Sequence, residues 1–385
     1  MDYEGKKFIY MDYGATTFVK REVIDEMKPF MEEYFGNPSS LYFISRKSKS
    51  AIDTARERTA CAINAEAEEI YFTGGGSESD NWAVKGTALA NMNKGRHIIT
   101  TNIEHHAVLN SCRYLEKHGF DVTYLPADKY GRINIEDLKR CITDKTILVS
   151  VMFANNEVGT IQPIKEIGKF CREKNIIFHT DAVQAAGHIP IDVKDMNIDL
   201  LSLSAHKFYG PKGMGALYVK KGIKIDNLIH GGSQERARRA GTENVAGIVG
   251  LGKAIEIAHK DIYSEIDRLI YLRDKFIEKL SVIPDFRLNG AKGHERLPGN
   301  VNASFKGTEN EVLLMRLDQE GICASAGSAC SAGALEPSHV LKSIGLKDDE
   351  ARCSVRFTLG ETTNEDEINI AADIIKKNVE KIRTF

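Results

Sequence analysis

The stretch from Leu200 to Lys207 reads Leu-Leu-Ser-Leu-Ser-Ala-His-Lys, an apolar run that ends in two basic side chains. Apolar residues fall at adjacent as well as alternate positions, which is typical of a strand that helices cover on both faces. Segments with helical periodicity, such as Ile164–Lys174, separate most of the similar runs. The middle of the chain therefore predicts an α/β fold with a mostly parallel sheet. The similar runs are Ile98–Thr101, Val122–Leu125, Ile147–Phe153, Ile176–His179 and Ala216–Val219.

The pattern of predicted helices and strands changes in the last third of the chain. The segment from Lys253 to Leu280 predicts one long amphipathic helix that bridges into a second unit. Strand-like and helix-like segments then alternate and indicate a smaller α+β unit. We expect a large domain at 18–258 and a small domain made of 1–17 and 259–385. The segments of the small unit are Val301–Phe305, Glu311–Leu317, Ser354–Thr358 and Asp366–Ile382.

Composition restricts the classes of partner. The 385 residues carry 52 Lys and Arg against 54 Asp and Glu, a formal net charge of -2. This balance gives no reason to expect nucleic acid or an anionic membrane as a partner. The sequence has no apolar run long enough to span a membrane. Its N-terminus also lacks the pattern of a signal peptide, in which a basic segment is followed by an apolar segment and small residues. We therefore expect a soluble cytoplasmic protein. Seven cysteines without a C-x-x-C pair argue against a disulfide framework and against a metal site.

Polar side chains follow four of the predicted strands. Each taken alone reads best as a turn, cap or solvated residue. The carboxyl ends of parallel strands meet at one edge of a sheet, where α/β proteins bind ligands, so the four groups together predict one site. They are His105 after the first strand, Asn156 after the third, Asp181 after the fourth and Lys207 after the fifth.

A glycine-rich turn supplies a fifth element. Thr73–Asp80 reads Thr-Gly-Gly-Gly-Ser-Glu-Ser-Asp, between the strand-like Ile70–Phe72 and a helical segment. Backbone N–H groups at such a turn can bind an anion, but Ser77 and Asp80 also fit a capping box, and the two interpretations are equally good. The turn lacks the Gly-Lys-Ser/Thr of a P-loop and the G-x-G-x-x-G spacing, so a nucleoside triphosphate or a dinucleotide is disfavoured.

A small phosphate ester near an amine, a carboxylate and a histidine fits these groups. Pyridoxal phosphate (PLP) needs a lysine for its Schiff base, a carboxylate at its pyridine nitrogen and a phosphate cradle. Lys207, Asp181 and the glycine turn match these three needs. The sequence therefore predicts a PLP enzyme.

With these residues placed, the segment Ser204–Gly213 resembles cysteine desulfurases of the NifS/IscS class, within the class-V aminotransferase family and fold type I. The likeness extends over almost the whole chain. It includes Asp12–Thr17, Gly36–Ser40, Glu104–Val108, Ala154–Gly159, Arg238–Val245 and Ser325–Cys330.

The resemblance implies a large domain with a mostly parallel seven-stranded sheet, and it implies a role for each matching residue. Lys207 carries the cofactor, Asp181 pairs with its ring nitrogen, and His105 stacks on the ring and moves protons. Gln184 lies near the phenolic oxygen, and Thr242 reaches the phosphate from the partner subunit of a homodimer. Asn37, Asn156 and Arg356 bind the substrate, with a guanidinium suited to its carboxylate. The remaining phosphate contacts are Gly76, Ser77, Ser204 and His206.

Cys330 is the expected sulfur carrier. Small residues surround it in Ser-Ala-Gly-Ser-Ala-Cys-Ser-Ala-Gly, which predicts an exposed loop rather than a core position. Cys323 lies in an apolar run, and we expect it to be structural, as we do the other five cysteines. The sequence departs from the family at Tyr13, which we expect to affect the substrate entrance, and at Ser77, which replaces a threonine and keeps the hydroxyl.

The implied reaction converts L-cysteine to L-alanine and leaves the sulfur as a persulfide on Cys330. The acceptor stays open between a NifU/IscU-like iron–sulfur scaffold, a tRNA-thiolation enzyme and another carrier. A selenocysteine lyase on the same fold would keep Lys207, Asp181 and His105 without needing Cys330. A non-catalytic scaffold protein is disfavoured because every chemically necessary residue is present.

Overall fold

The computed structural model describes residues 2–3, 5–327 and 337–384. Its centre is a seven-stranded sheet in which β10 runs antiparallel to both of its neighbours and all other adjacent pairs are parallel. The predicted α/β class with a mostly parallel sheet is therefore confirmed. In order across the sheet the strands are β4 (Ile70–Thr73), β10 (Gly215–Val219), β9 (Leu200–Ser204), β8 (Ile177–Asp181), β7 (Thr146–Ser150), β5 (His97–Thr101) and β6 (Asp121–Leu125).

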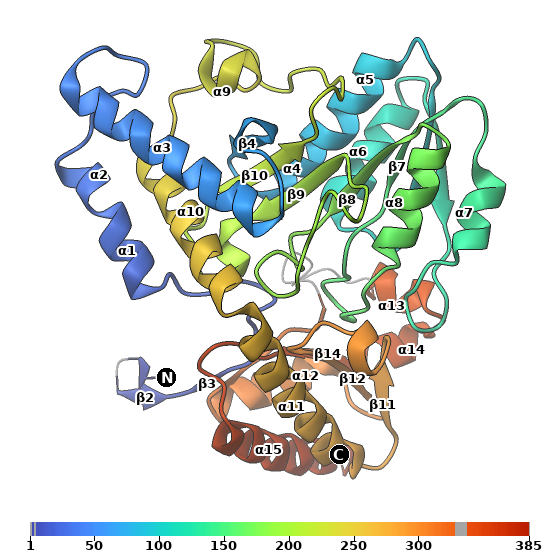
Figure 1. Ribbon diagram of the computed structural model, residues 1–385. Coiled ribbons are helices and arrows are strands. Elements are labelled where there is room, and N and C mark those ends of the chain that lie inside the picture. The colour runs from blue at the N-terminus through green and yellow to red at the C-terminus, as the bar shows by residue number, and fades with distance from the viewer. Residues whose placement is uncertain (1, 4, 328–336, 385) are drawn as a thin grey trace.

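Helices cover both faces of this sheet (Figure 1). Adjacent strand residues enter different cores: Ile98 and Leu148 pack on one face, and Ile99 and Val149 on the other. This two-sided burial explains why the strands read as continuous apolar runs. One face carries α3 (Phe43–Ala62), α7 (Ile135–Cys141), α8 (Ile164–Glu173) and α10 (Val245–Lys260), and the other carries α4 (Gly76–Asn81), the π-helical η2 (Trp82–Gly86), α5 (Thr87–Asn91) and α6 (His106–Glu116).

A second core lies below the first in Figure 1, around a three-stranded antiparallel sheet. Phe276, Phe305 and Phe357 are fully buried in it, and Met11 joins it from the N-terminal segment. The core elements are α11 (Ile262–Ser281), β11 (Phe286–Asn289), β12 (Asn300–Phe305), α12 (Asn310–Gln319), β14 (Ser354–Thr358) and α15 (Glu365–Arg383). The remaining elements are β1 (Asp2–Tyr3), β2 (Lys6–Lys7), β3 (Ile9–Tyr10), α1 (Arg21–Met27), α2 (Pro29–Glu32), η1 (Ala67–Glu69), η3 (Ala205–Lys207), α9 (Gln234–Ala237), η4 (Gly293–Glu295), β13 (Ile322–Cys323), α13 (His339–Ser343) and α14 (Asp348–Ala351).

The predicted single helix over Lys253–Leu280 is wrong. The segment is two helices, α10 and α11, with a break at Asp261, whose φ of -108° and ψ of 13° are not helical. Each helix packs in a different core, so the break lies where the chain leaves one core for the other. Both helices carry an apolar stripe, which is why the periodicity alone did not show the break.

Two residues singled out in the sequence lie as follows. Tyr13 is only 4% exposed and packs on Tyr10 and Tyr209. Cys61 is exposed, whereas Cys112 and Cys171 are buried as expected. Among the described helices, none has the length and apolarity that a membrane crossing requires.

Candidate active site

A cavity of about 180 Å³ lies at the carboxyl end of the parallel strands. Ten of the residues singled out in the sequence line it. It also contains the backbone of Gly14 and Ala15 from the N-terminal segment, and Asp80 from α4. The ten are Gly76, Ser77, His105, Asn156, Asp181, Gln184, Ser204, His206, Lys207 and Arg356.

Lys207 enters the cavity from η3, directly after β9. Its Nζ donates to the carbonyl oxygens of Gly14 at 2.6 Å and Ala15 at 2.7 Å. The Thr17 hydroxyl donates to the His206 carbonyl and accepts the N–H of Tyr209. The N-terminal segment thus fixes the turn that presents the amine, although it is nearly two hundred residues away in sequence.

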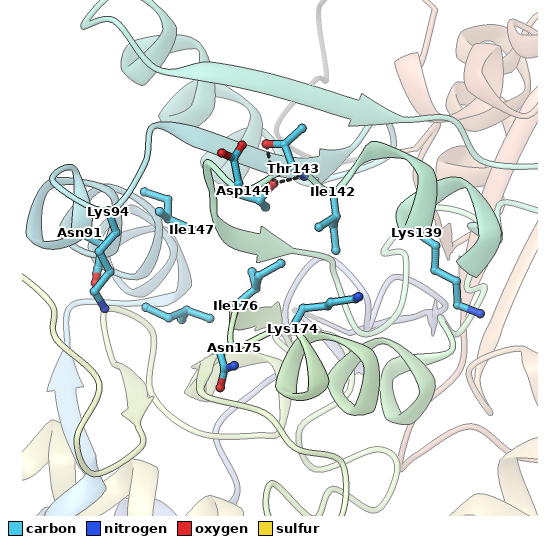
Figure 2. A pocket seen from close by; sticks show the side chains of 12 residues that line it. Asn91, Lys94, Lys139, Ile142, Thr143, Asp144, Ile147, Lys174, Asn175 and Ile176 are labelled. Atoms are coloured by element: carbon cyan, nitrogen blue, oxygen red, sulfur yellow. Dashed lines mark hydrogen bonds between the residues drawn. The ribbon is translucent and has the colours of Figure 1, made fainter.

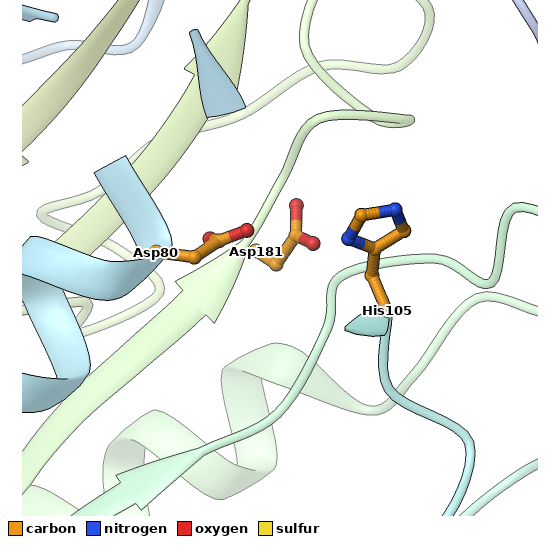
Figure 3. Close-up of side chains that lie close together, drawn as sticks. All are labelled: Asp80, His105 and Asp181. Atoms are coloured by element: carbon orange, nitrogen blue, oxygen red, sulfur yellow. The ribbon is translucent and has the colours of Figure 1, made fainter. Parts of the chain in front are cut away.

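Asp181 is the last residue of β8, and its Oδ1 accepts the Val183 N–H at 2.9 Å. Burial raises the pKa of this carboxyl, while His105 and Lys207 oppose the rise. Figure 3 shows the Asp181 carboxyl between the imidazole of His105 and the carboxyl of Asp80. A positively charged nitrogen placed in the cavity would stabilise the ionised form of Asp181.

His105 is the N-cap of α6, where its Nδ1 accepts the Ala107 N–H at 3.2 Å. This bond places the ring proton of the neutral imidazole on Nε2. Burial lowers the pKa of His105, and the negative charge of Asp181 opposes that effect. The ring is therefore a neutral group that faces the cavity and can exchange a proton.

The glycine turn resolves the choice that the sequence left open. Helix α4 begins at Gly76, its N-cap is Gly75, and no side chain caps it, so the Ser77–Asp80 capping box is wrong. No side chain takes the first-turn N–H groups as a cap, so they stay available for an anion. A Cβ at Gly76 would lie 2.7 Å from Val183 Cγ2, so only glycine leaves room beside the turn. His206 adds a ring on the same side, with a pKa lowered to about 4 by burial and by the neighbouring Lys207.

Arg356 approaches the cavity from β14 of the second core and is 1% exposed. Its Nη2 bonds Asp12 Oδ1 at 2.8 Å and its Nη1 donates to the Asn156 carbonyl at 3.0 Å. The Nε of Arg356 is buried and has no hydrogen-bond partner within the described part of the chain. A buried guanidinium with a donor to spare suits a carboxylate ligand.

Three predicted residues are not brought to this cavity. Asn37 is exposed, and its Oδ1 accepts the Ser39 N–H in the loop before α3. Thr242 is also exposed and does not line the cavity. Cys330 lies outside the described residues. Its described neighbours are anchored near the cavity: the Ser325 hydroxyl donates to Asp12 at 2.7 Å, and the Ser338 hydroxyl donates to Glu157.

Sequence reasoning missed the role of Gly14 and Ala15, whose carbonyls hold the lysine, and took Asp80 for a cap. The position of Gly14 and Ala15 inside the quoted Asp12–Thr17 motif was the available signal. A larger cavity of about 480 Å³ lies elsewhere, at the amino ends of β7 and β8 (Figure 2). Lysines and short polar side chains line it at the sheet edge opposite to Lys207, so the smaller cavity is the candidate active site.

Comparisons with known proteins agree with this geometry. The family described as "Aminotransferase class-V" matches residues 9–370. "Cysteine desulfurase IscS" of Clostridium botulinum is 60% identical, covering 98% of this chain and 96% of that protein, and its namesake from Methanosarcina thermophila is 56% identical over 98% and 94%. A solved "NifS-like protein" superposes with a TM-score of 0.92 at 36% identity, over 97% of this chain and 100% of that chain. "SspA in complex with cysteine" gives 0.80 at 40%, over 91% and 98%.

Proposed function

This chain belongs to the class-V aminotransferase family, and we infer from that membership and from the cavity around Lys207 that it is a cysteine desulfurase. Its cofactor is PLP, on which the family depends. The observation that carries the inference is that a single cavity contains an amine, a carboxylate, an imidazole and an uncapped helix start. A guanidinium at the same cavity adds a site for the carboxylate of an amino acid.

The residues present fit the cofactor. We propose that Lys207 binds it covalently, that Asp181 pairs with the ring nitrogen, and that His105 stacks on the ring. The start of α4 at Gly76 and Ser77, with Ser204 and His206, would hold the phosphate, and Gln184 would lie near the phenolic oxygen. When bound, PLP withdraws electrons from the Cα of an attached amino acid.

Chain residues then perform the remaining steps. Arg356 and the side chain of Asn156 orient the carboxylate of L-cysteine. Lys207, once displaced, is the base that removes the Cα proton, and His105 exchanges protons through Nε2. The carbonyls of Gly14 and Ala15 accept from the Lys207 amine, and this contact would hold the amine in place once it is displaced from the cofactor.

Cys330 is the proposed nucleophile. Its thiolate attacks the substrate sulfur, an S–S bond forms, and the Cβ–S bond breaks with its electron pair on the carbon side. The amino-acid part takes up protons and leaves as L-alanine, while the sulfur stays on Cys330 as a persulfide. The anchoring of Ser325 and Ser338 near Arg356 and Glu157 supports this role because both described flanks start at the cavity.

Peptide mass spectrometry after a brief incubation with L-cysteine tests the assignment. We expect the persulfide on Cys330, and we expect Cys330→Ser to bind L-cysteine yet form almost no alanine. Cys323→Ser is the matched control, since Cys323 lies in β13 and its turnover per folded molecule should stay close to wild type. A persulfide mainly on Cys323, or an active Cys330→Ser enzyme, contradicts the proposal. Activity of Cys330→Ser on selenocysteine alone would favour the selenocysteine lyase.

The partners are proposals of the same kind. We propose a cytoplasmic homodimer that passes sulfur to a NifU/IscU-like iron–sulfur scaffold or to a tRNA-thiolation enzyme. The six cysteines in the described part of the chain are free thiols, which suits a reducing compartment. Exposed large apolar side chains lie on α1, on α2, in the segment between α2 and α3 and at the start of α3, which supports burial by a second copy. They include Ile24, Met31, Phe35, Leu41, Tyr42 and Phe43.

A further inference from the structure

Asp80 is a buried carboxyl group to which the proposed reaction assigns no task. It lies near the end of α4, lines the cavity and is 1% exposed. Its Oδ1 has no hydrogen-bond partner in the described part of the chain. A buried carboxylate has a high free energy when one of its oxygens contacts neither a cation nor a hydrogen-bond donor. Such a group is usually protonated, which removes the charge.

The basic group nearest to Asp80 does not supply a counter-charge. Among the described residues, the one ion-pair contact of Asp80 is with His179, whose Nε2 is 3.8 Å from Oδ1. His179 is fully buried, and its two ring nitrogens bond the hydroxyls of Ser150 and Ser202. Burial lowers the pKa of His179 to about 3, so the ring is neutral. Asp80 therefore faces a neutral imidazole and a serine hydroxyl.

On its other side Asp80 faces a second carboxyl. Oxygens of Asp80 and Asp181 and a ring nitrogen of His105 all lie within 4.8 Å of one another. In Figure 3 the Asp181 carboxyl is in the middle, with Asp80 to its left and His105 to its right. Two carboxylates at this separation in a buried site do not both ionise, because their repulsion is poorly screened.

The surroundings decide which of the two carries the proton. Asp181 has the His105 ring and the Lys207 amine on its cavity side and the Val183 N–H on one oxygen, all of which favour its ionised form. For Asp80, burial and the charge of Asp181 oppose ionisation, and the Ser202 hydroxyl favours it. The pKa of Asp80 is accordingly raised well above its usual value, chiefly by burial.

We propose that Asp80 is a positioning residue that stays protonated, so that its neutral carboxyl packs against Asp181 and leaves Asp181 as the single anion facing the ring nitrogen of PLP. The part that concerns the ring nitrogen rests on the proposed function. An ionised Asp80 would instead add a second negative charge behind Asp181 and raise the proton affinity of the cofactor nitrogen and of the Schiff base.

Infrared spectroscopy of the apoprotein tests the protonation without the cofactor. Aspartate labelled with carbon-13 at the side-chain carboxyl separates Asp from Glu bands, including that of Glu104. At pH 7 we expect the band of a protonated aspartic acid in the wild type, its persistence in Asp181→Asn and its loss in Asp80→Asn. Glu78→Gln, a change on the same helix in a partly exposed ion pair with Arg239, is the matched control and should leave the band in place. If the protonated band is absent from the wild type, or survives in Asp80→Asn, the proposal is wrong.

The holoenzyme provides a second readout through the pH titration of the cofactor's absorbance. Asp80→Asn keeps a neutral side chain of the same shape, so its midpoint should stay within about 0.3 pH unit of wild type. A shift of one unit or more would mean that the wild-type residue is charged. If Asp80→Asn does not fold, the infrared spectrum of the Asp181→Asn apoprotein tests the proposal by itself. A band of protonated aspartic acid in that variant belongs to Asp80, because Asp181 has been replaced. Failure of the proposed function would appear separately, as a wild-type protein that binds no PLP.

Discussion

Asp12 joins the two groups that we expect to handle the substrate. One of its oxygens bonds Arg356 and the other accepts the Ser325 hydroxyl. Arg356 and Ser325 also exchange both of their backbone hydrogen bonds, at 2.7 Å and 3.2 Å. The backbone thus already holds Arg356 and Ser325 side by side, and Asp12 fixes the orientation of the two side chains relative to each other.

Asp12→Ala should raise the KM for L-cysteine about tenfold, because a charge-assisted bond that orients the guanidinium is lost. The absorbance of bound PLP should stay unchanged, since Asp12 does not line the cofactor cavity. Steady-state kinetics beside a cofactor spectrum measure both. Asp25→Asn, which removes one partner of the exposed pair with Arg21, is the control and should leave the KM as it is. An unchanged KM in Asp12→Ala would show that Asn156 holds Arg356 without help.

The buried carboxyl group of Glu104 predicts how the stability of the folded protein depends on pH. Its Oε1 accepts from the Met152 N–H and the Thr101 hydroxyl, whereas its Oε2 is buried and has no partner among the described residues. Burial raises the pKa of Glu104 from 4.5 to about 8. The folded state then keeps a proton that the unfolded state has released. The stability from this group is full below about pH 4.5 and is lost progressively as the pH rises to about 8.

Glu104→Gln keeps the acceptor oxygen and cannot ionise. Between pH 5.5 and 7.5 the wild-type apoprotein should lose up to about 1.4 kcal/mol per pH unit relative to the variant. Urea unfolding of both proteins at the two pH values isolates this difference, because all other titrating groups are shared. Parallel stability curves for the two proteins would refute the raised pKa.

At the scale of elements, the start of α4 has no room for an additional methyl group. Gly76→Ala would place Cβ 2.7 Å from Val183 Cγ2 and 3.5 Å from Ser204 Cβ. Overpacking of this kind costs about 1 to 3 kcal/mol, and the strain falls on the phosphate cradle. We expect PLP affinity to fall about tenfold or more, with partial rescue in Gly76→Ala/Val183→Ala.

The control for this change lies in the same turn. Gly74→Ala meets only the carboxyl end of the flexible Glu78 side chain, so it should bind PLP nearly as well as wild type. A fluorescence titration of the apoproteins with PLP measures all three variants. Equal affinity for Gly76→Ala and Gly74→Ala would mean that the phosphate is not held at the start of α4.

The sheet and the residues at its edge could be predicted from the sequence because both follow from local pattern. Two-sided burial gives runs such as Leu200–Ser204, and the residues after them had to meet at one edge. The antiparallel direction of β10 could not be predicted in this way, because a buried strand has the same apolar sequence pattern whether it is parallel or antiparallel to its neighbours. The break at Asp261 and the parallel pairing of β3 with β13 depend on contacts between distant segments.

The site was predictable only in part, for related reasons. His105, Asp181 and Lys207 each follow a strand, so their meeting could be foreseen. The buried state of Asp80 depends on the packing of α4 against β9 and β10, and the carbonyls of Gly14 and Ala15 carry no side-chain signal. The role proposed for Thr242 requires a second chain, so the structure of one chain does not test it.

At the scale of the whole molecule, the question is whether one active site needs two chains. Arg239 pairs with Glu78 at 2.9 Å, so the loop that contains Thr242 lies beside α4, yet Thr242 is exposed and does not line its own cavity. In a two-fold dimer, a residue at an exposed loop can complete the site of the other subunit. We expect Thr242→Ala alone to bind PLP about tenfold more weakly, which corresponds to one hydrogen bond to a charged group.

A mixed dimer of Lys207→Ala and Thr242→Ala chains separates the two arrangements. With a different affinity tag on each chain, the mixed dimer can be purified without either parent. If Thr242 acts across the interface, one of the two sites combines the intact Lys207 of one chain with the intact Thr242 of the other. At PLP concentrations that saturate wild type but not Thr242→Ala, the mixed dimer should then show about half of the wild-type rate of alanine formation. If Thr242 acts within its own chain, each site contains one of the two substitutions, and the rate stays at or below half that of the Thr242→Ala parent.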